Sequence, residues 1–418
     1  MTTPHAGPAL DALRGLSVGD ALGAQFFVPE TARAHLADRT DPPGPWPWTD
    51  DTEMACSVHA AHTERGTIDT FDLTHAFARR HDFDRGYGPA ANRMLRLIRE
   101  GGDAKRLAAE LFDGQGSYGN GAAMRVAPLG AAYAEDLDEA VRQAARTAVV
   151  THTHPQAVDG AVAVAVAAAL AARARTETMT PKTFLGRVAH HTPLGAVHDG
   201  LTEAIGLLAE PDLRVAAHVL GNGSRTSAAD TVPYALWCAA RRLTDYRAAV
   251  WEAIAAGGDM DTVAAITGGV VAARTGTRGI PAAWMAAREP LPAWAFPAPD
   301  SIPDGRGREE MLVPRPFPVP NVVWTDEQWQ RIRTGSDPAA MDHRRQVLTH
   351  EGTLRLCHPG GPARWEVTVA RVRNGWRPVS AVAETAHHRF PTDADRSPLL
   401  LARLLRNAAD GEWSPVRP

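Results

Sequence analysis

Two short acidic clusters lie far apart in the chain, and each combines carboxylates with a threonine hydroxyl. The first is Thr49-Asp50-Asp51, and the second is Asp259-Met260-Asp261-Thr262. Each cluster opens a stretch whose hydrophobic pattern predicts a helix. If the two clusters meet in space, they form an all-oxygen site of the kind that hard divalent cations prefer. Such a site suits a substrate that carries phosphates or a sugar diol.

Helix capping is the simpler interpretation of the first cluster, because Asp50 followed by Glu53 is a capping box. A cap needs only one acidic residue, however, and two adjacent carboxylates repel each other unless a cation or solvent compensates their charge. The second cluster has the same ambiguity. The glycine pair before it allows a tight loop, in which the Asp259 and Asp261 side chains can lie on one side.

A glycine-rich segment, GSYGNGAAMR from Gly116 to Arg125, is a candidate anion-binding loop. Its glycines leave backbone N–H groups uncovered, and we expect the segment to enter a helix, whose N-terminus attracts anions. The alternative is a flexible turn. His152 and His154 have two interpretations. Either histidine hydrogen-bonds a sugar or phosphate, or it lies at the C-terminus of a helix, where the helix dipole favours a positive charge. Asp20, between small residues, is either a structural acid or a residue that positions ligands.

The bulk composition is that of a large globular protein with a sizeable core. The chain has 418 residues, a hydrophobic content of 44% and a net charge of −4, which implies no polyanionic partner. Cys56, Cys238 and Cys357 have no paired spacing, so we expect neither a disulfide framework nor a zinc ribbon, and a reduced cytoplasmic location. No signal peptide pattern is present at the N-terminus. The apolar stretch Ala157–Ala172 is short for a bilayer, so we expect a buried helix and no membrane partner.

The organisation along the chain indicates a compact all-α domain over residues 1–288, then a proline-rich linker or surface strap over 289–320, and a small α+β module over 321–418. Helical periodicity recurs at Leu10–Ala24, Thr52–Glu64, Phe71–His81, Pro89–Glu100, Leu137–Val150, Asp159–Arg175, Val197–Leu208, Ala228–Leu243, Tyr246–Ala256 and Thr262–Arg274. In the last module we expect strands at Thr353–Leu356, Trp365–Val372 and Trp376–Val382, a hairpin turn at Asn374-Gly375, and a helix at Pro398–Ala408. His387-His388 is either a metal-binding pair or an inert surface pair.

Five motifs, taken in order, resemble those of the ADP-ribosylglycohydrolase family. They are GDALGA from Gly19, WTDDTEMA from Trp48, GSYGNGAAMRVAPLG from Gly116, THTHP from Thr151 and GGDMDTVAAITGGVVAARTG from Gly257. They span about residues 10 to 288. The family fold is an all-α bundle with a dinuclear magnesium site, so the resemblance implies two Mg²⁺ ions here, with Mn²⁺ as an alternative. It also implies ADP-ribose or an ADP-ribosylated substrate as the partner.

The resemblance assigns roles by position. It implies a metal shell made of Thr49, Asp50, Asp51, Asp259, Asp261 and Thr262. It places the ADP-ribose along Ser117, Tyr118, Gly119, Asn120, Gly121 and Met124, with His152 beside it. Family members often carry a glutamate after the GDALGA segment. Phe27 occupies that position here, and Glu30 is the candidate replacement.

The implied activity is hydrolysis of the glycosidic bond at C1″ of ADP-ribose. Asp50, Asp51 or Asp261 would accept a proton from the attacking water, and Glu30 would act near the scissile bond. The leaving group stays open among arginine, serine, a nucleic-acid base and a small metabolite, and no basic surface pattern favours nucleic acid. Two alternatives are a silent ADP-ribose-binding protein and a different metal-dependent nucleotide hydrolase. The sequence does not determine the oligomeric state.

Overall fold

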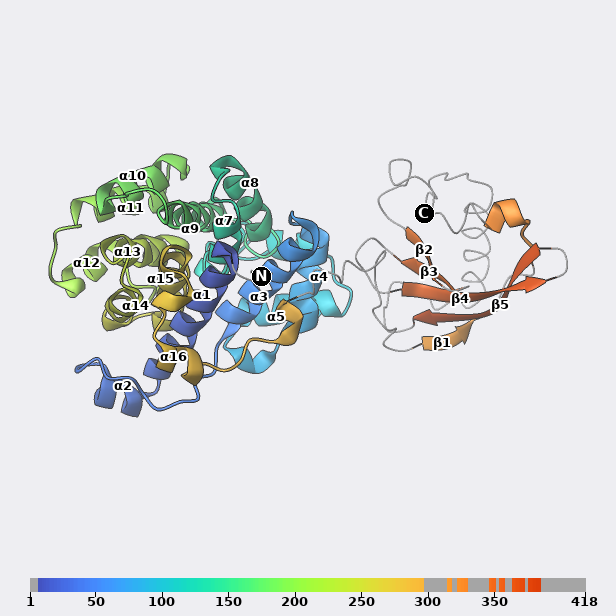
Figure 1. Ribbon diagram of the computed structural model, residues 1–418, viewed down its shortest axis with the longest axis horizontal. Coiled ribbons are helices and arrows are strands. Elements are labelled where there is room, and N and C mark those ends of the chain that lie inside the picture. Colours follow the sequence, from blue (N-terminus) through green and yellow to red (C-terminus); the bar gives the residue numbers. More distant parts are fainter. Residues whose placement is uncertain are drawn as a thin grey trace. The chain divides into compact units, whose positions relative to one another are not determined.

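The computed structural model describes residues 7–296, 314–317, 322–329, 346–350, 353–357, 363–372 and 375–384. The chain divides into two compact units, Met1–Pro299 and Asp300–Pro418. The first unit is helical and the second contains a β-sheet (Figure 1). The predicted fold class is therefore confirmed. The predicted boundaries at 288 and 320 and the cytoplasmic location stay predictions.

All the helices that the hydrophobic pattern predicts in the first unit are present, with ends that differ by a few residues. The helices of the first unit are α1 Pro8–Ala24, α2 Pro29–His35, α3 Asp50–Arg65, α4 Thr70–Arg80, α5 Pro89–Arg99, α6 Ala104–Ala109, α7 Ala127–Ala132, α8 Leu137–Ala148, α9 Pro155–Arg173, α10 Pro181–His191, α11 Ala196–Gly206, α12 Leu213–Leu220, α13 Ala228–Arg241, α14 Tyr246–Ala255, α15 Met260–Thr275 and α16 Ala282–Ala287. Short 3₁₀ helices lie at η1 Gln25–Phe27, η2 Phe83–Arg85, η3 Asn120–Ala122, η4 Thr277–Gly279 and η5 Ala293–Ala295. Most of the helices that the pattern missed span only about two turns, too few for an apolar periodicity to recur.

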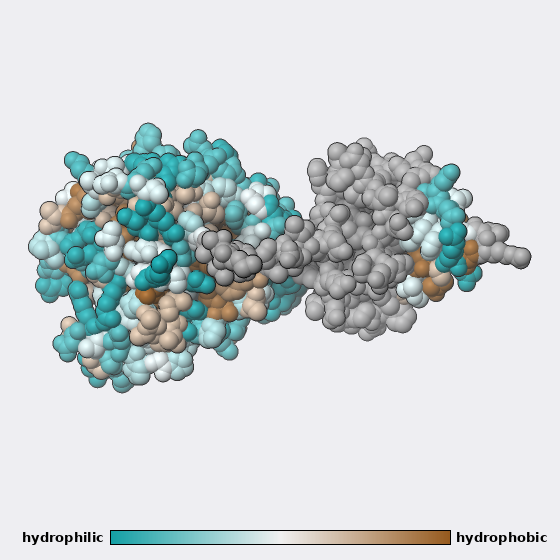
Figure 2. Space-filling view, viewed as in Figure 1, coloured by the Kyte–Doolittle hydropathy of each residue, from teal (hydrophilic) through white to brown (hydrophobic). Residues whose placement is uncertain are grey.

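The alanine- and valine-rich helix α9 lies inside the first unit. Among the described residues it is the one helix long and apolar enough to cross a membrane, but 83% of its apolar window is buried within the protein. It packs against α7, α8, α13 and α15. The prediction of a buried helix is thus confirmed, with helix packing as the physical reason for its apolar surface. Figure 2 shows that the outer face of this unit is mainly hydrophilic, with small separate hydrophobic patches.

Helices α1 and α15 are in backbone contact along most of their length, and this contact positions the acidic residues. Gly15, Gly19 and Gly23 recur every four residues on one face of α1, and a Cβ atom at any of them would collide with the backbone or a Cβ of α15. The contacts run in opposite directions along the two helices, from Gly15 beside Gly268 to Gly23 beside Met260. The C-terminal half of α1 therefore lies beside the N-terminus of α15 (Figure 1).

The first residues of the predicted proline-rich linker lie on the helical unit. The Glu289 N–H donates to Trp46 O at 2.9 Å, and the Glu289 carboxylate accepts two hydrogen bonds from Arg85 at 2.7 and 2.8 Å. Trp48 Nε1 donates to Pro290 O at 3.3 Å. The strap alternative therefore describes this stretch better than a free linker does.

The second unit contains an antiparallel sheet in the order β1-β5-β4-β3-β2. The strands are β1 Pro314–Phe317, β2 Gln346–His350, β3 Thr353–Cys357, β4 Ala363–Val372 and β5 Gly375–Glu384. The three predicted strands are present, and Val372 pairs with Gly375 across the predicted hairpin. The pattern missed β2, and β1 falls in the stretch predicted to be a linker. Asn374, the helix at Pro398–Ala408 and the His387-His388 pair lie outside the described residues.

Candidate active site

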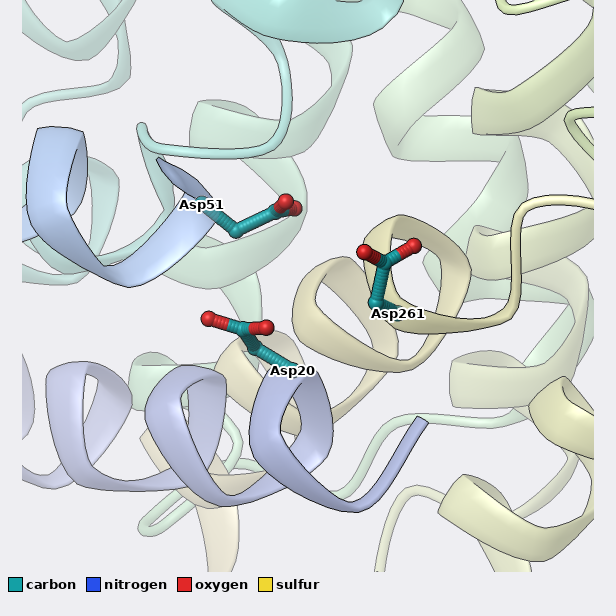
Figure 3. Close-up of side chains that lie close together, drawn as sticks. All are labelled: Asp20, Asp51 and Asp261. Atoms are coloured by element: carbon teal, nitrogen blue, oxygen red, sulfur yellow. The ribbon is translucent and has the colours of Figure 1, made fainter. Parts of the chain in front are cut away.

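The two acidic clusters converge, and Asp20 joins them. One carboxylate oxygen each from Asp20, Asp51 and Asp261 lies within 4.8 Å of the others. Figure 3 shows the three carboxyl groups, carried by α1, α3 and α15, pointing into one shared space. Residues from distant parts of the sequence therefore form a single acidic site.

Asp20 organises the start of α3. Its carboxylate accepts hydrogen bonds from the Thr49 N–H at 3.0 Å and the Thr49 hydroxyl at 2.8 Å. It also accepts from the Thr52 N–H at 3.1 Å and the Thr52 hydroxyl at 2.5 Å. Asp20 is fully buried. These bonds hold both of its oxygens, so its geometry is that of a residue that positions the ligands of α3.

The two oxygens of Asp51 differ in how they are hydrogen-bonded. Its Oδ2 accepts from the Thr49 hydroxyl at 3.2 Å and the Thr262 hydroxyl at 3.4 Å. Its Oδ1 is buried and has no hydrogen-bond partner within residues 7–296. An unpaired buried polar atom costs about 1–3 kcal/mol. The site therefore has one strong acceptor whose natural partner is a cation or a bound ligand.

Burial raises the pKa of Asp51 and of Asp261 well above the ordinary carboxyl value, and the charges of neighbouring aspartates raise it further. The same two causes raise the pKa of Asp50 to about 8. Without a counter-ion, these groups cannot all ionise at low energetic cost. A divalent cation between them would remove that repulsion.

Capping does not explain the first cluster. Thr49 is the N-cap residue of α3 and makes no side-chain capping bond, and the Glu53 side chain turns away. Instead, Glu53 accepts a hydrogen bond from the Tyr87 hydroxyl at 2.6 Å and from the Asp82 N–H at 3.2 Å. Asp259 is the N-cap residue of α15 and makes no capping bond either. The carboxylates are thus left available to the site.

The glycine-rich segment is joined to the second cluster through Asn120. The Asn120 amide donates to Asp259 Oδ2 at 2.6 Å and to the Thr231 hydroxyl at 3.0 Å. The segment itself forms only the 3₁₀ helix η3, and the helix predicted to follow it, α7, begins at Ala127. Three residues of 3₁₀ helix supply no appreciable helix dipole. Any anion bound here would depend on the uncovered N–H groups of the loop itself.

Sequence reasoning missed a second loop, Gly221–Ser227, that links these parts. Its Thr226 carbonyl accepts from the Asn120 N–H at 3.0 Å, and its Asn222 carbonyl accepts from the Asp259 N–H at 3.0 Å. Thr226 has a φ of 53°, an uncommon conformation for a β-branched residue. The letters GNGSRTS, which resemble the glycine-rich segment in composition, were the available signal.

His152 packs against the glycine-rich segment. A Cβ atom added to Gly119 would lie 3.3 Å from His152 Nε2, and one added to Gly121 would lie 3.0 Å from it. Burial, together with the charge of Arg125, lowers the pKa of His152 to about 3. His154 does not sit at a helix C-terminus as the dipole interpretation requires. It caps the N-terminus of α9, and its Nδ1 accepts from the Gln156 N–H at 3.1 Å.

The remaining predicted substrate residues differ in position. Tyr118 is 43% exposed, and its ring lies 5.7 Å from that of Phe112, which is 49% exposed. The Ser117 hydroxyl is buried and accepts from the Gly119 N–H at 3.2 Å. Met124 is buried in the hydrophobic core, which argues against direct contact with a substrate.

Glu30 lies exposed on α2, and no hydrogen bond or ion pair joins it to the carboxylates within residues 7–296. Phe27, at the family's glutamate position, is 51% exposed. The catalytic role of Glu30 stays a prediction that its position does not support.

Comparisons with known proteins agree with this site. A sequence model of the family described as ADP-ribosylglycohydrolase matches residues 2–307. The chain is similar to ADP-ribosylhydrolase ARH3 of Bos taurus, with 30% identity over 65% of this chain and 86% of that protein. It is similar to the ADP-ribosyl-[dinitrogen reductase] glycohydrolase of Rhodospirillum rubrum, with 29% identity over 66% of this chain and 88% of that protein.

A solved structure of an ADP-ribosylglycohydrolase-related protein complex superposes with a TM-score of 0.50 and 28% identity, over 68% of this chain and 92% of that chain. Residues 2–307, which the family model matches, contain both acidic clusters, the glycine-rich segment and His152. The chain therefore belongs to the ADP-ribosylglycohydrolase family and is an enzyme that hydrolyses ADP-ribose from modified substrates.

Proposed function

We propose that this enzyme requires Mg²⁺ and cleaves the glycosidic bond at C1″ of ADP-ribose in an ADP-ribosylated side chain, base or small molecule. The observation that carries the metal requirement is Asp51: its buried Oδ1 has no partner among the described residues, and its Oδ2 has only long contacts with the hydroxyls of Thr49 and Thr262, at 3.2 and 3.4 Å. An orphaned carboxylate oxygen among other carboxylates fits a hard cation.

The donor set fits two such ions. The residues that would hold them are Thr49, Asp50, Asp51, Asp259, Asp261 and Thr262, all of which offer oxygen. Asp20 would keep the first cluster in place through its bonds to Thr49 and Thr52. When bound, Mg²⁺ would act as a Lewis acid that orients the distal ribose and lowers the pKa of water.

The carboxylates of the chain would handle the proton and the developing charge. Asp50, Asp51 and Asp261 are candidates to accept the proton from the attacking water. They interact strongly, so they would titrate as a group, and a single general base is not assigned. Their negative charge would also stabilise the oxocarbenium-like positive charge at C1″.

Outside the acidic site, the surface offers matching contacts for the rest of ADP-ribose. The exposed ring pair Tyr118 and Phe112 would stack with the adenine. The loop from Ser117 to Gly121 would follow the diphosphate and ribose, because Gly119 and Gly121 place no side chain beside His152. His152, beside both glycines, would contact the same part of the ligand.

Calorimetric titration of ADP-ribose in Mg²⁺ and then in EDTA tests the proposal. We expect binding that requires the metal. Turnover is then measured with arginine-, serine- and base-linked ADP-ribose, and free ADP-ribose should be the product. AMP or phosphate as the product would indicate a nucleotide hydrolase instead, and tight binding without any turnover would indicate a binding protein.

A further inference from the structure

We propose that Arg125, acting through the Thr151 hydroxyl, holds His152 as the neutral tautomer with its proton on Nε2. His152 then offers a fixed N–H donor to a ligand oxygen beside the glycine-rich segment. Arg125 and Thr151 are positioning residues in this arrangement. The part that concerns the ligand rests on the proposed function, whereas the tautomer itself does not.

The direction of the hydrogen bonds carries the inference. Arg125 is fully buried, and its Nη2 donates to Thr147 O at 2.6 Å and to the Thr151 hydroxyl at 2.9 Å. A guanidinium only donates, so the Thr151 oxygen must accept this bond. The Thr151 hydroxyl lies 2.7 Å from His152 Nδ1, and within residues 7–296 it has no other acceptor. Its own proton therefore points at Nδ1, which must be the unprotonated nitrogen.

The other protonation states of His152 are disfavoured. A proton on Nδ1 would face the Thr151 hydroxyl proton, and one of these two donors would lose its acceptor, at about 1–3 kcal/mol. The doubly protonated ring would place a buried positive charge near the Arg125 guanidinium. Burial and this charge already lower the pKa of His152 to about 3. The neutral ring with Nε2–H satisfies Arg125, the Thr151 hydroxyl and Nδ1, and it leaves the Nε2–H donor for a ligand.

The free nitrogen of the ring faces the glycine-rich segment. Among the described residues, no hydrogen-bond partner is present at His152 Nε2, and this atom lies next to Gly119 and Gly121. Any side chain at Gly121 would sit 2.8 Å from the ring carbon Cε1. Glycine at both positions keeps a side chain out of the region beside Nε2. Oxygens of a diphosphate or a ribose are acceptors that match a neutral N–H.

Nitrogen-15 NMR of the histidine-labelled, ligand-free protein reads the tautomer directly. The ring nitrogens of His152 are identified by the signals that disappear in His152→Gln. We expect a protonated Nε2 and an unprotonated Nδ1 between pH 6 and 8. A proton on Nδ1, or a doubly protonated ring, would overturn the proposal without any functional assay.

Two variants test the relay. Thr151→Val removes the hydroxyl and keeps the branched shape, and we expect mixed tautomers and ADP-ribose affinity weaker by about 2- to 10-fold. Thr151→Ser should restore both. Thr192→Val is the matched control. Thr192 is also buried, but its hydroxyl donates to the backbone oxygen of Val188 at 2.9 Å and not to a histidine.

A Thr151→Val protein whose tautomer and affinity equal those of the Thr192→Val control would overturn the relay. If Thr151→Val fails to fold, the wild-type spectrum still decides the tautomer. A wild-type protein that binds no ADP-ribose would overturn the proposed function and leave the tautomer result standing.

Discussion

Replacing Asp51 with asparagine should change stability and metal binding in opposite directions. Asparagine keeps nearly the same shape and one acceptor oxygen, but it removes a negative charge from a group of buried carboxylates. In the metal-free protein, that charge is repelled by Asp261 and Asp20, and Oδ1 has no partner among the residues that the structure describes. We therefore expect Asp51→Asn to be more stable than wild type in EDTA and unable to gain stability from Mg²⁺.

The magnitude depends on pH, and the sign follows from the raised pKa values. A carboxyl whose folded pKa is raised favours the folded state fully below its unfolded pKa of 3.8, and this contribution disappears as pH rises through the folded pKa. For Asp50 this loss extends to a pKa of about 8. We expect similar stabilities for Asp51→Asn and wild type near pH 4, and an increasing advantage of Asp51→Asn as the pH rises. At pH 9 we expect a gain of about 1–3 kcal/mol from removing an ionised, unpaired group.

Thermal unfolding followed by circular dichroism measures both effects. A gain of that size corresponds to roughly 2–10 °C in Tm for a domain of a few hundred residues. In Mg²⁺ at about 100 times its Kd, the wild type should gain about 2.7 kcal/mol, and Asp51→Asn should gain nothing comparable.

Asp11→Asn is the control for this experiment, on the same helix as Asp20. Burial raises the pKa of Asp11, but hydrogen bonds from Thr277 and Arg175 outweigh it and lower the pKa overall. Asp11→Asn should therefore destabilise the protein at pH 9. An Asp51→Asn protein that is less stable than wild type at pH 9 in EDTA, or that keeps the Mg²⁺ effect, would refute the reasoning.

Three further changes test the site and its supports. Asp259→Ala or Asp261→Ala should abolish ADP-ribosyl hydrolysis while the helical circular dichroism stays near wild type, and retained turnover would argue against the metal shell. Thr226→Gly should raise the free energy of unfolding by about 1 kcal/mol in denaturant titration, because glycine adopts the φ of 53° without strain; unchanged or lower stability would contradict this. Gly19→Ala should lower that free energy by about 1–3 kcal/mol or more, since its Cβ would meet Ala264 O of α15, and a neutral effect would mean that the α1–α15 contact can widen.

Local patterns were sufficient for much of the helical unit. Helix propensity and apolar periodicity depend on neighbours within a few turns, so α1, α3, α9 and α15 could be predicted from the letters alone. Short helices such as α7 and α12 carry less than a few periods and were missed. The strand β1 was missed because its prolines indicate a linker when no partner strand is known.

For the acidic residues, the sequence by itself determined their identity and pairing with threonines, and the resemblance of five motifs predicted the family. Their convergence was decided only by tertiary structure. Glycines of α1 allow backbone contact with α15, and that contact brings Asp20 and Asp261 beside Asp51. The sequence did not decide whether Asp20 is a structural acid or a residue that positions ligands. Only the fold shows that Thr49 and Thr52 hold both of its oxygens.

The composition of the loop Gly221–Ser227 did not indicate that it joins the two site segments. The sequence also did not indicate that Arg125 and Thr151 hydrogen-bond behind His152. Hydrogen bonds between residues distant in sequence have no periodic signature, since they depend on where packed helices place their ends. Neighbouring residues therefore determine which functional groups are present and which helices carry them. The direction of each carboxylate and each ring nitrogen is set by the packing of the whole helical unit.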